Sequence, residues 1–404
     1  MNACDERQIV VPEAVVRAIL SQEKIDEPPH SFYKYPARFS PVFAREVIRA
    51  FSEPGETVLD PFCGGGTTLV EAMSLARRAV GFDISSLATF IARAKTTPLS
   101  IHDKRHILAR VKVLGSMQPS DTVSLFRTDQ EESYYQRNLP EVAKAFFDRI
   151  LAWTKLLSTK RQQRFVRLVL LSVGQWALDC KTQTPTWAEL QAKFTTQLIA
   201  VLDGHYHFLT NVAVANKLPR CQLTKLRRII NRSSEQSAED GRIPVHWLPA
   251  KLVVTSPPYP GVHMLYHRWQ IHGRRETPIP FWLANVPAGA GEAFYCLGSR
   301  EEPKLSTYFQ RLEKAFSSVK GLLGKNSLIV QLVAFSEPEW QLPAYLESMG
   351  RAGLTEVKPR CDRKYLFQGR IWRQVPGRKW YACQKGQTTS SKEVFLLHKL
   401  IDTE

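Results

Sequence analysis

The segment 57–83 constrains the fold more than any other part of the sequence. A short apolar strand ends at Asp60, and a run of three glycines follows at 64–66. The pattern then predicts a helix over 69–76 and a second short strand that ends at Asp83. A strand, a glycine turn, a helix and a second strand ending in an acid are typical of the opening of a doubly wound α/β sheet.

This alternation of strands and helices is interrupted and later resumes. Residues 101–223 show long helical periodicities and no clear strand. We therefore expect one Rossmann-like doubly wound sheet with a helical insertion. The first part of the sheet domain is predicted over 1–100, the insertion over 101–223 and the second part over 224–404. A segment over 260–303, rich in Gly, Pro, Arg and aromatic residues, is predicted to lack regular structure and to be functional or mobile.

Composition narrows the class of protein further. The chain has 404 residues, of which 44% are apolar, so global disorder is excluded. With 55 Lys and Arg against 38 Asp and Glu, the net charge is +17, which favours a polyanionic partner, nucleic acid first. The seven cysteines include no CxxC pair, which favours a reducing compartment, the cytoplasm. No signal peptide and no membrane-spanning helix are expected.

The first motif with chemical meaning runs from Asp60 to Thr68 and reads Asp-Pro-Phe-Cys-Gly-Gly-Gly-Thr-Thr. Glycines between a strand and a helix let a ligand approach the backbone and leave N–H groups free. Asp60 is placed to accept from a ligand ammonium, and Asp83, 23 residues later, to bind ribose hydroxyls. The pattern is neither GxGxxG nor a P-loop. The alternative interpretation is a plain glycine turn with two solvated acids.

The second motif is an apolar strand that runs into Ser-Pro-Pro-Tyr at 256–259. Two prolines remove two N–H donors and leave carbonyls pointing outward. Ser256 adds a hydroxyl acceptor and Tyr259 a flat ring. The combination suits a planar base that carries an exocyclic amine, whereas the alternative is an ordinary Pro-Pro loop with a packed tyrosine.

Together the two motifs resemble those of S-adenosylmethionine-dependent DNA amino-methyltransferases. The Ser-Pro-Pro-Tyr form is similar to the N4-cytosine branch, whereas N6-adenine enzymes more often carry Asp-Pro-Pro-Tyr. The run from His30 to Phe39, His-Ser-Phe-Tyr-Lys-Tyr-Pro-Ala-Arg-Phe, resembles the family's additional cofactor motif. Gly-Phe-Asp-Ile at 81–84 resembles its acid-bearing second motif.

The resemblance implies S-adenosylmethionine as cofactor and methyl transfer to the N4 amine of cytosine in double-stranded DNA. Hydrogen bonds from the amine to the Ser256 hydroxyl and the Pro257 carbonyl would localise its lone pair, and the flipped base would stack on Tyr259. The insertion would read the target sequence. The cofactor residues implied are Phe32, Tyr35, Pro36, Ala37, Asp60, Phe62, Gly64, Gly66, Thr67, Asp83 and Ile84, and the catalytic residues are Ser256, Pro257, Pro258 and Tyr259.

This sequence departs from the family pattern in two places. Ala250-Lys251 stands where the family often has an acid before the catalytic strand. The stretch Asn-Arg-Ser-Ser-Glu at 231–235 lacks the Asp that usually contacts the adenine amine. Which residue of this sequence takes the place of that Asp, which belongs to the family's third motif, stays open.

Three basic clusters are candidates for contacts with DNA phosphates. The residues singled out in them are Arg227, Arg228, Arg268, Arg274, Arg275, Arg373 and Lys379. The alternative for any single cluster is a solvated face. His263 and His267 have metal-ligand spacing but lack the Glu of HExxH, so no metal site is expected.

Several functions remain alternatives at this point. They are an N6-adenine DNA methyltransferase, an RNA base methyltransferase, and a non-catalytic DNA-binding protein with a methyltransferase-like fold. The sequence leaves open the recognition site, the oligomeric state, and whether a cognate restriction endonuclease or a defence system accompanies the protein.

Overall fold

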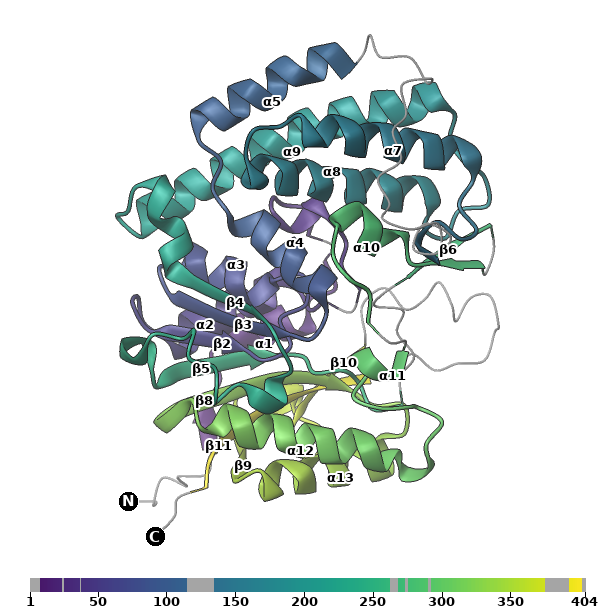
Figure 1. Cartoon of the computed structure of the whole chain (residues 1–404). Helices are drawn as coiled ribbons and strands as arrows, with labels where there is room; N and C mark the ends of the chain where they lie inside the picture. Colours follow the sequence, from purple (N-terminus) through teal and green to yellow (C-terminus); the bar gives the residue numbers. More distant parts are fainter. Residues whose placement is uncertain are drawn as a thin grey trace, which may run out of the picture.

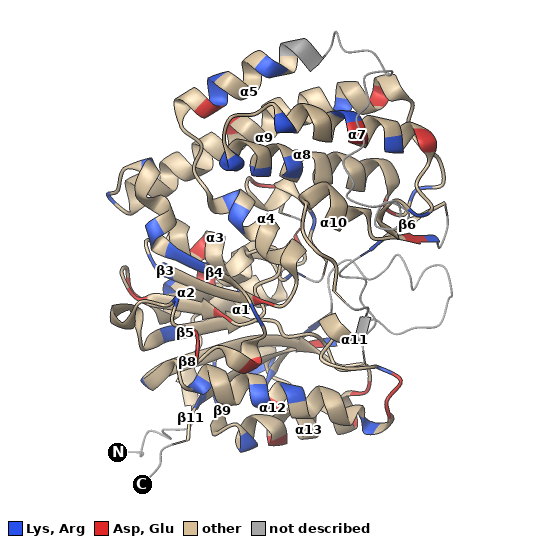
Figure 2. Ribbon diagram, in the orientation of Figure 1, with Lys and Arg blue, Asp and Glu red and all other residues tan. Residues whose placement is uncertain are grey.

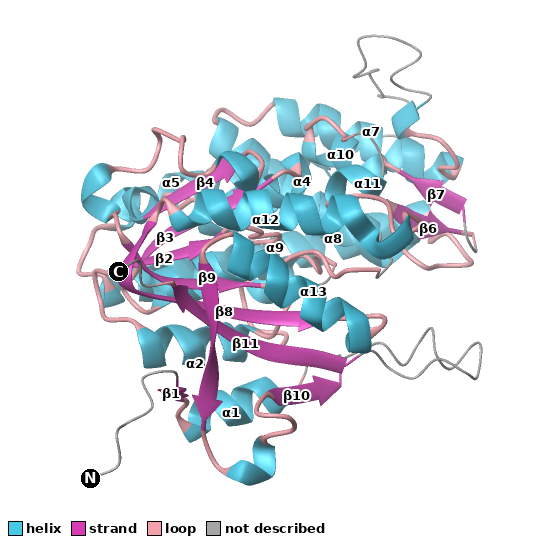
Figure 3. Cartoon of the chain, turned by 90° about the horizontal axis from the view of Figure 1, so that it is seen from below, coloured by secondary structure: helices cyan, strands magenta, loops and turns pink. Residues whose placement is uncertain are grey.

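The central element of the molecule is a nine-stranded sheet (Figures 1 and 3). The computed structural model describes residues 8–23, 25–36, 38–114, 134–261, 268–272, 275–289, 292–374 and 392–401. The strand order is β1-β9-β11-β8-β5-β2-β3-β4, with β10 paired to β11. The strands of this sheet are β1 Gln8–Val10, β2 Thr57–Asp60, β3 Arg78–Asp83, β4 Arg227–Asn231, β5 Ala250–Thr255, β8 Leu323–Ala334, β9 Leu354–Arg360, β10 Ile371–Gln374 and β11 Lys392–Leu400.

The sheet is parallel except around one strand. The neighbours from β8 through β5, β2 and β3 to β4 pair in parallel, whereas β11 lies antiparallel between β8 and β9. Because carboxyl ends of parallel strands meet at one edge, Asp60, Asp83, Asn231 and Thr255 end their strands on the same side. The predicted doubly wound sheet is therefore confirmed.

Helices cover both faces of the sheet. They are α1 Glu13–Leu20, α2 Pro41–Phe51, α3 Thr67–Ser74, α4 Ser86–Thr96, α5 Ile101–Leu114, α7 Glu141–Lys155, α8 Lys160–Leu178, α9 Trp187–Ala215, α10 Ile279–Ala284, α11 Glu292–Tyr295, α12 Ser306–Lys320 and α13 Pro338–Arg351. The strand β2 shows how the faces are divided. Val58 packs in a core with α1, α2 and α3, whereas the next residue, Leu59, packs in a core with α12 and α13.

The helices between α4 and β4 form a layer of their own at the top of Figure 1. α5, α7, α8 and α9 lie in this part of the chain, and their apolar residues make one core with α4. The long helix α9 runs out of this layer. Its last turns pack with α3, and the Asn216 side chain donates to the Met73 carbonyl at 2.8 Å.

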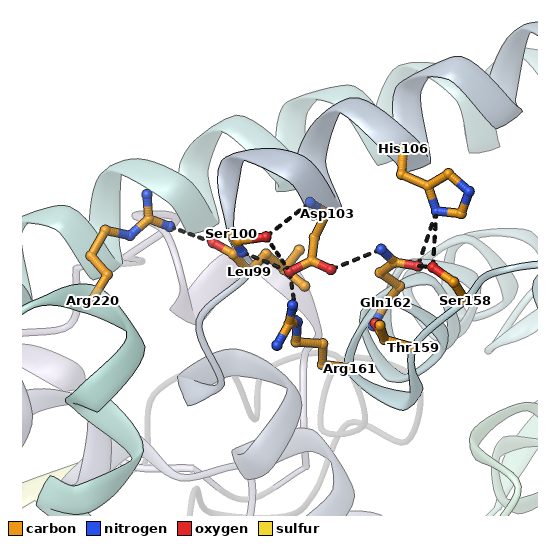
Figure 4. A network of polar contacts seen from close by, with 9 residues as sticks. All are labelled: Leu99, Ser100, Asp103, His106, Ser158, Thr159, Arg161, Gln162 and Arg220. Carbon is orange, nitrogen blue, oxygen red and sulfur yellow. Dashed lines mark hydrogen bonds and ion pairs between the residues drawn. The ribbon is translucent and has the colours of Figure 1, made fainter.

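A buried carboxylate fastens α5 to α8 (Figure 4). Asp103 accepts from Arg161 Nε at 2.6 Å and from Gln162 Nε2 at 2.8 Å, and from the Ser100 hydroxyl at 2.8 Å. Burial raises the pKa of Asp103, but these donors outweigh it, so the pKa is lowered overall. The start of the helical layer is thus fixed by a satisfied charge rather than by apolar contact alone.

The prediction that 260–303 lacks regular structure is wrong for the described part of the segment. It contains a hairpin of β6 Trp269–Ile271 and β7 Arg275–Thr277, followed by α10 and α11. Trp269 is buried in the core of the helical layer, and its indole N–H donates to the Tyr33 hydroxyl at 3.2 Å. A Cβ on Gly174 of α8 would lie 2.8 Å from the Trp269 ring, so the helix and hairpin approach closely. These elements are too short for a periodic pattern and form because distant residues bury them.

The first elements of the chain, β1 and α1, were also not predicted. β1 pairs in parallel with β9, which comes more than 300 residues later. A search of the described residues found no helix long and apolar enough to cross a membrane.

Candidate active site

A cavity of about 820 Å³, its open mouth included, lies at the edge where the strands β2, β3 and β5 end. The lining residues are Tyr35, Pro36, Arg38, Phe39, Asp60, Phe62, Cys63, Gly64, Gly65, Thr67, Asp83, Ile84, Ser85, Ser233, Ser234, Ser256, Pro258, Tyr295, Leu297 and Arg311. Residues from both sequence motifs therefore line one cavity.

Asp60 is the acid at the end of β2 and is 1% exposed. One carboxylate oxygen accepts from the Thr255 hydroxyl at 2.7 Å and from the Phe62 N–H at 3.1 Å, and the other accepts from the Thr68 hydroxyl at 2.7 Å. Burial raises the pKa of Asp60 to about 6. Since a carboxylate has about four acceptor positions, one remains for a ligand.

Asp83 is the acid at the end of β3. Its two oxygens accept from the backbone N–H groups of Gly64 and Ser85, each at 2.8 Å. Burial raises the pKa of Asp83 to about 6 as well. About two acceptor positions remain, which is the number that a vicinal diol needs.

The glycine turn brings the backbone close to its neighbours. A Cβ on Gly65 would lie 2.9 Å from the Tyr35 Cβ, and one on Gly66 would lie 2.8 Å from the Ala92 Cβ. Gly66 also has φ +83°, which other residues rarely adopt. A larger residue at either position would push Tyr35 or α4 away from the cavity wall.

The upstream motif reaches the cavity through four residues, Tyr35, Pro36, Arg38 and Phe39. Phe32 does not line it: the ring is 2% exposed and packs in the core of the helical layer. Ala37 lies outside the described residues. Gly66 likewise is not part of the lining, because it turns toward Ala92 of α4.

A buried carboxylate, Glu71, anchors this upstream segment to α3. Glu71 accepts from His30 Nε2 at 2.7 Å and from Arg45 Nε at 2.7 Å. Burial raises the pKa of Glu71, but the two donors outweigh it and lower the pKa overall. Burial also lowers the pKa of His30 more than Glu71 raises it. A neutral His30 therefore donates to an ionised Glu71.

The catalytic motif follows β5, and Ser256 and Pro258 line the cavity. The Ser256 hydroxyl donates to the Tyr259 hydroxyl at 3.1 Å, which in turn donates to Glu393 Oε1 at 2.6 Å. The Tyr308 hydroxyl donates to the Pro258 carbonyl at 2.8 Å. Tyr259 is 8% exposed, packs in the core beside α12 and is not part of the cavity wall, and neither is Pro257.

Several residues at the site were missed by sequence reasoning. Tyr295 and Leu297 come from the 260–303 segment, and Arg311, which pairs with Glu235 at 2.8 Å, comes from α12. Lys95 of α4 is 2% exposed behind the turn, with its ammonium 3.7 Å from where a Gly65 Cβ would be, and burial lowers its pKa to about 7. The aromatic content of 260–303 was the one signal in the sequence for any of these.

Of the 231–235 stretch, Ser233 and Ser234 line the cavity. Asn231 turns away, because its side-chain amide donates to the backbone carbonyls of Asp83 and Ile84 at 2.9 and 3.0 Å. Ser233 and Ser234 are therefore the residues of this stretch nearest to a ligand in the cavity.

The prediction that Arg373 contacts phosphate is wrong. The residue is 7% exposed, and its Nε donates to Glu393 at 2.5 Å while a second nitrogen donates to the Ile19 carbonyl at 2.9 Å. The basic cluster around Arg373 looked surface-exposed because charge alone does not reveal a buried partner on another strand.

Three of the other six predicted phosphate contacts are also engaged within the protein. Arg227 donates to the Thr97 hydroxyl at 2.8 Å, and burial lowers its pKa to about 9. Arg228 lies over the Trp247 ring at 4.6 Å, and Arg268 pairs with Glu276 at 3.0 Å. Arg275 is exposed. Arg274 and Lys379, like His263 and His267, lie outside the described residues.

A search of the described residues for metal sites found no group of three or more His, Cys, Asp or Glu side chains placed to hold an ion. In the view of Figure 2, the Lys and Arg positions are spread along many helices and strands of the ribbon.

Comparison with known proteins finds similarity to one family in the first part of the chain. The family model of N6/N4 methyltransferases, described as DNA methylase, matches residues 15–92. The Type II methyltransferase M.MjaII of Methanocaldococcus jannaschii is 30% identical over 90 residues, which cover 22% of this chain and 17% of that protein. The Type II methyltransferase M.MvaI of Kocuria varians is 30% identical over 136 residues, which cover 31% of this chain and 26% of that protein.

The chain thus spans 17% and 26% of the lengths of these two relatives. Among solved structures, the rRNA methyltransferase AviRa from Streptomyces viridochromogenes has 11% sequence identity and a TM-score of 0.34, covering 93% of this chain and 94% of that one. S-adenosylmethionine is the cofactor of the family that residues 15–92 match. The part of the chain that carries Asp60, the glycine turn and Asp83 is therefore similar to the N6/N4 DNA methylases.

Proposed function

We propose that this protein is an S-adenosylmethionine-dependent DNA methyltransferase that methylates the N4 amine of cytosine. One observation carries the proposal. Two motifs far apart in sequence, the acid-bearing glycine turn and Ser-Pro-Pro-Tyr, line one cavity, and Asp60 and Thr255, 195 residues apart, are joined at 2.7 Å. A glycine turn or a Pro-Pro loop with only a structural role would not need this meeting.

The cavity fits the chemistry of the cofactor. Asp83 has free acceptor positions for the ribose hydroxyls, and Asp60 has one for the methionine ammonium. Arg38 in the wall supplies positive charge for the methionine carboxylate. A side chain at Gly65 would meet the Tyr35 Cβ at 2.9 Å, so glycine there lets Tyr35 keep its place in the cavity wall.

S-adenosylmethionine, when bound, supplies an electrophilic methyl group on a sulfonium. The chain's residues act on the acceptor amine. Its lone pair is delocalised into the base, and hydrogen bonds to the Ser256 hydroxyl and the Pro257 carbonyl localise it as the new C–N bond forms. The Pro258 carbonyl already accepts from Tyr308, which fixes the loop. As the new C–N bond forms, the methyl–sulfur bond would break and leave a neutral thioether, and the methylated amine would release one proton to solvent water. Holding amine and methyl in line lowers the barrier.

An N6-adenine target is the second candidate, because the family model that matches residues 15–92 covers both N6 and N4 enzymes. Serine at 256, in place of the aspartate more frequent in N6 enzymes, favours cytosine.

We further propose that the partner is double-stranded DNA, in line with the net charge of +17, and that the insertion over 101–223 reads the target sequence. The target base would leave the duplex, since its amine is inaccessible inside it. The ring of Tyr259, 8% exposed and packed in the core beside α12, is not placed to stack on that base, so the predicted stacking is left out of the proposal.

Nucleoside mass analysis of DNA from cells that express the protein tests the proposal. The expected product is N4-methylcytosine, and it should be missing with the Ser256→Ala variant as control. DNA that carries only N6-methyladenine, or label found only in RNA, would contradict the substrate.

A further inference from the structure

One tyrosine, Tyr259, connects the Ser256 hydroxyl to a buried carboxylate on β11, that of Glu393. Ser256 Oγ lies 3.1 Å from Tyr259 Oη, and Tyr259 Oη lies 2.6 Å from Glu393 Oε1. Glu393 is 4% exposed, and its other oxygen accepts from Arg373 Nε at 2.5 Å. These hydrogen bonds lead from the cavity wall into the core. The sequence motif contains Ser256 and Tyr259, whereas Glu393 was not predicted.

The ends of this chain fix the direction of every hydrogen bond in it. A carboxylate accepts only and a guanidinium donates only, so Arg373 and Tyr259 must both donate to Glu393. Once the Tyr259 proton points at Glu393, its oxygen can only accept from Ser256. The Ser256 proton is thereby directed toward Tyr259, and the Ser256 oxygen keeps acceptor positions for a group in the cavity that Ser256 lines.

We propose that Glu393 is a positioning residue that acts through Tyr259 to make the Ser256 hydroxyl an acceptor toward the target amine. This inference rests on the proposed function. A serine hydroxyl is by itself as able to donate as to accept, and a donated hydrogen bond would withdraw the amine lone pair that the reaction needs. An ionised aspartate at the same position has no proton and needs no such device. The hydrogen bonds from Ser256 to Tyr259 and from Tyr259 to Glu393 therefore make the serine an acceptor, as an aspartate at this position would be.

The first test removes the hydroxyl that joins Ser256 to Glu393. Tyr259→Phe deletes the relaying hydroxyl and leaves the Arg373–Glu393 pair intact. We expect kcat to fall by roughly tenfold, the worth of one hydrogen bond, with the dissociation constant for S-adenosylmethionine unchanged. Glu393→Gln, whose amide can donate to Tyr259 and reverse the chain, should behave in the same way. Tyr345→Phe is the matched control, because it removes a buried hydroxyl that accepts from Gln331 at 2.9 Å outside the site.

The second test separates positioning from a merely structural role. In a Ser256→Asp background, the carboxylate at position 256 is a hydrogen-bond acceptor regardless of its neighbours. Adding Tyr259→Phe or Glu393→Gln to this variant should therefore cause no further loss of kcat. A binding measurement accompanies this test. It compares the affinity for two oligonucleotides that carry the mapped site, one with cytosine at the target position and one with 2-pyrimidinone, which lacks the amine. The wild-type protein should prefer cytosine, and Tyr259→Phe should lose that preference.

The outcomes distinguish this inference from the proposed function. If the wild-type protein makes no N4-methylcytosine, the proposed function fails. If it does, and either variant keeps wild-type kcat or Tyr259→Phe keeps the preference for cytosine, the positioning role of Glu393 is refuted while the function stands. An equal further loss in the Ser256→Asp background would also refute it.

Discussion

Asp60 and Asp83 are carboxyl groups that the fold desolvates before any ligand arrives. Burial raises the pKa of each to about 6, against an ordinary value of 3.8. In the free protein each group therefore adds stability that is fully present below pH 3.8 and is lost as the pH rises through about 6. A bound ammonium or ribose needs the ionised form, so the free energies of folding and of binding respond to pH in opposite directions.

We expect the affinity for S-adenosylmethionine to be constant above about pH 7 and to fall below pH 6. The loss should approach roughly tenfold per pH unit for each carboxylate that must be ionised. Calorimetric titrations at pH 5, 6, 7 and 8 measure this. An affinity that stays constant from pH 5 to 8 would contradict the placing of the two acids at the ligand.

The two acids are also expected to hold different parts of the cofactor. Asp60→Ala should weaken the binding of S-adenosylhomocysteine by about 1.5–3 kcal/mol, the free energy contributed by a hydrogen bond to a charged group. It should not weaken 5′-methylthioadenosine, which has no ammonium. Asp83→Ala should weaken both, since both carry the ribose.

Tyr259→Ala serves as control for these calorimetric measurements. It should leave both affinities near the wild-type values while turnover falls strongly. An Asp60→Ala variant that loses both ligands equally would place Asp60 away from the methionine end.

At the scale of elements, the attachment of the upstream motif to α3 rests on a single carboxylate. His30 and Glu71 side chains are each 2% exposed, and Arg45 joins them from α2. Glu71→Ala would remove the acceptor of the buried His30 Nε2 and leave Arg45 with the more distant carboxylate of Glu27, at 3.6 Å. We expect a loss of about 3 kcal/mol in the free energy of unfolding, measured by denaturant titration.

Glu347→Ala is the matched control for this loss. Glu347 pairs with Arg351 at 2.6 Å on the surface of α13, with 71% of its side chain exposed. Removal of such a pair should change the free energy of unfolding by about 0.5 kcal/mol or less. Equal losses from the two variants would show that the His30–Glu71–Arg45 cluster does not anchor the upstream motif.

The strands around the motifs could be predicted from sequence, because β2 and β3 are short apolar runs bounded by an acid and glycines. β6, β7 and α10 could not. Their apolar residues, such as Trp269 and Phe281, follow no sustained period and are buried by the distant helix α8. The contact with α8 cannot be predicted from the residues of these short elements alone.

The same limit applies to the site. The two motifs predicted Asp60, Asp83 and Ser256 because each carries its chemistry in consecutive residues. Glu393 is 134 residues from Tyr259 and was not found, and Arg373 was assigned to phosphate. Both assignments depend on the register of β10 against β11, which no spacing in the sequence encodes.

At the scale of the molecule, the insertion and the 260–303 segment are not separate candidates for target recognition. The turn after α8 bridges to β6 at Lys181 and Ile271, and the two parts share one core. Lys181, Thr182 and Gln183 are exposed there. We expect alanine at these three positions to change which site is methylated, as read by methylome sequencing, with losses of about 1–3 kcal/mol per base contact.

Lys217 and Lys225 are exposed, unlike the arginines around them. Alanine at either should lower DNA affinity for every sequence alike and reduce the salt slope by about one. Binding titrations at several salt concentrations, on specific and unrelated duplexes, measure it. If the lysine variants change the methylated site and the 181–183 variants do not, the assignment of reading to the insertion is wrong.

The course of α9 decides how this protein can be re-engineered. Leu190, Phe194 and Leu198 near its start belong to the core of the helical layer, whereas Phe208 and Leu209 near its end belong to a core of the sheet. One continuous helix is therefore a structural member of both. A chimera that exchanges the helical layer as a cassette would have to be joined inside α9, and it would succeed only where the donor helix keeps the same rotational phase through the junction.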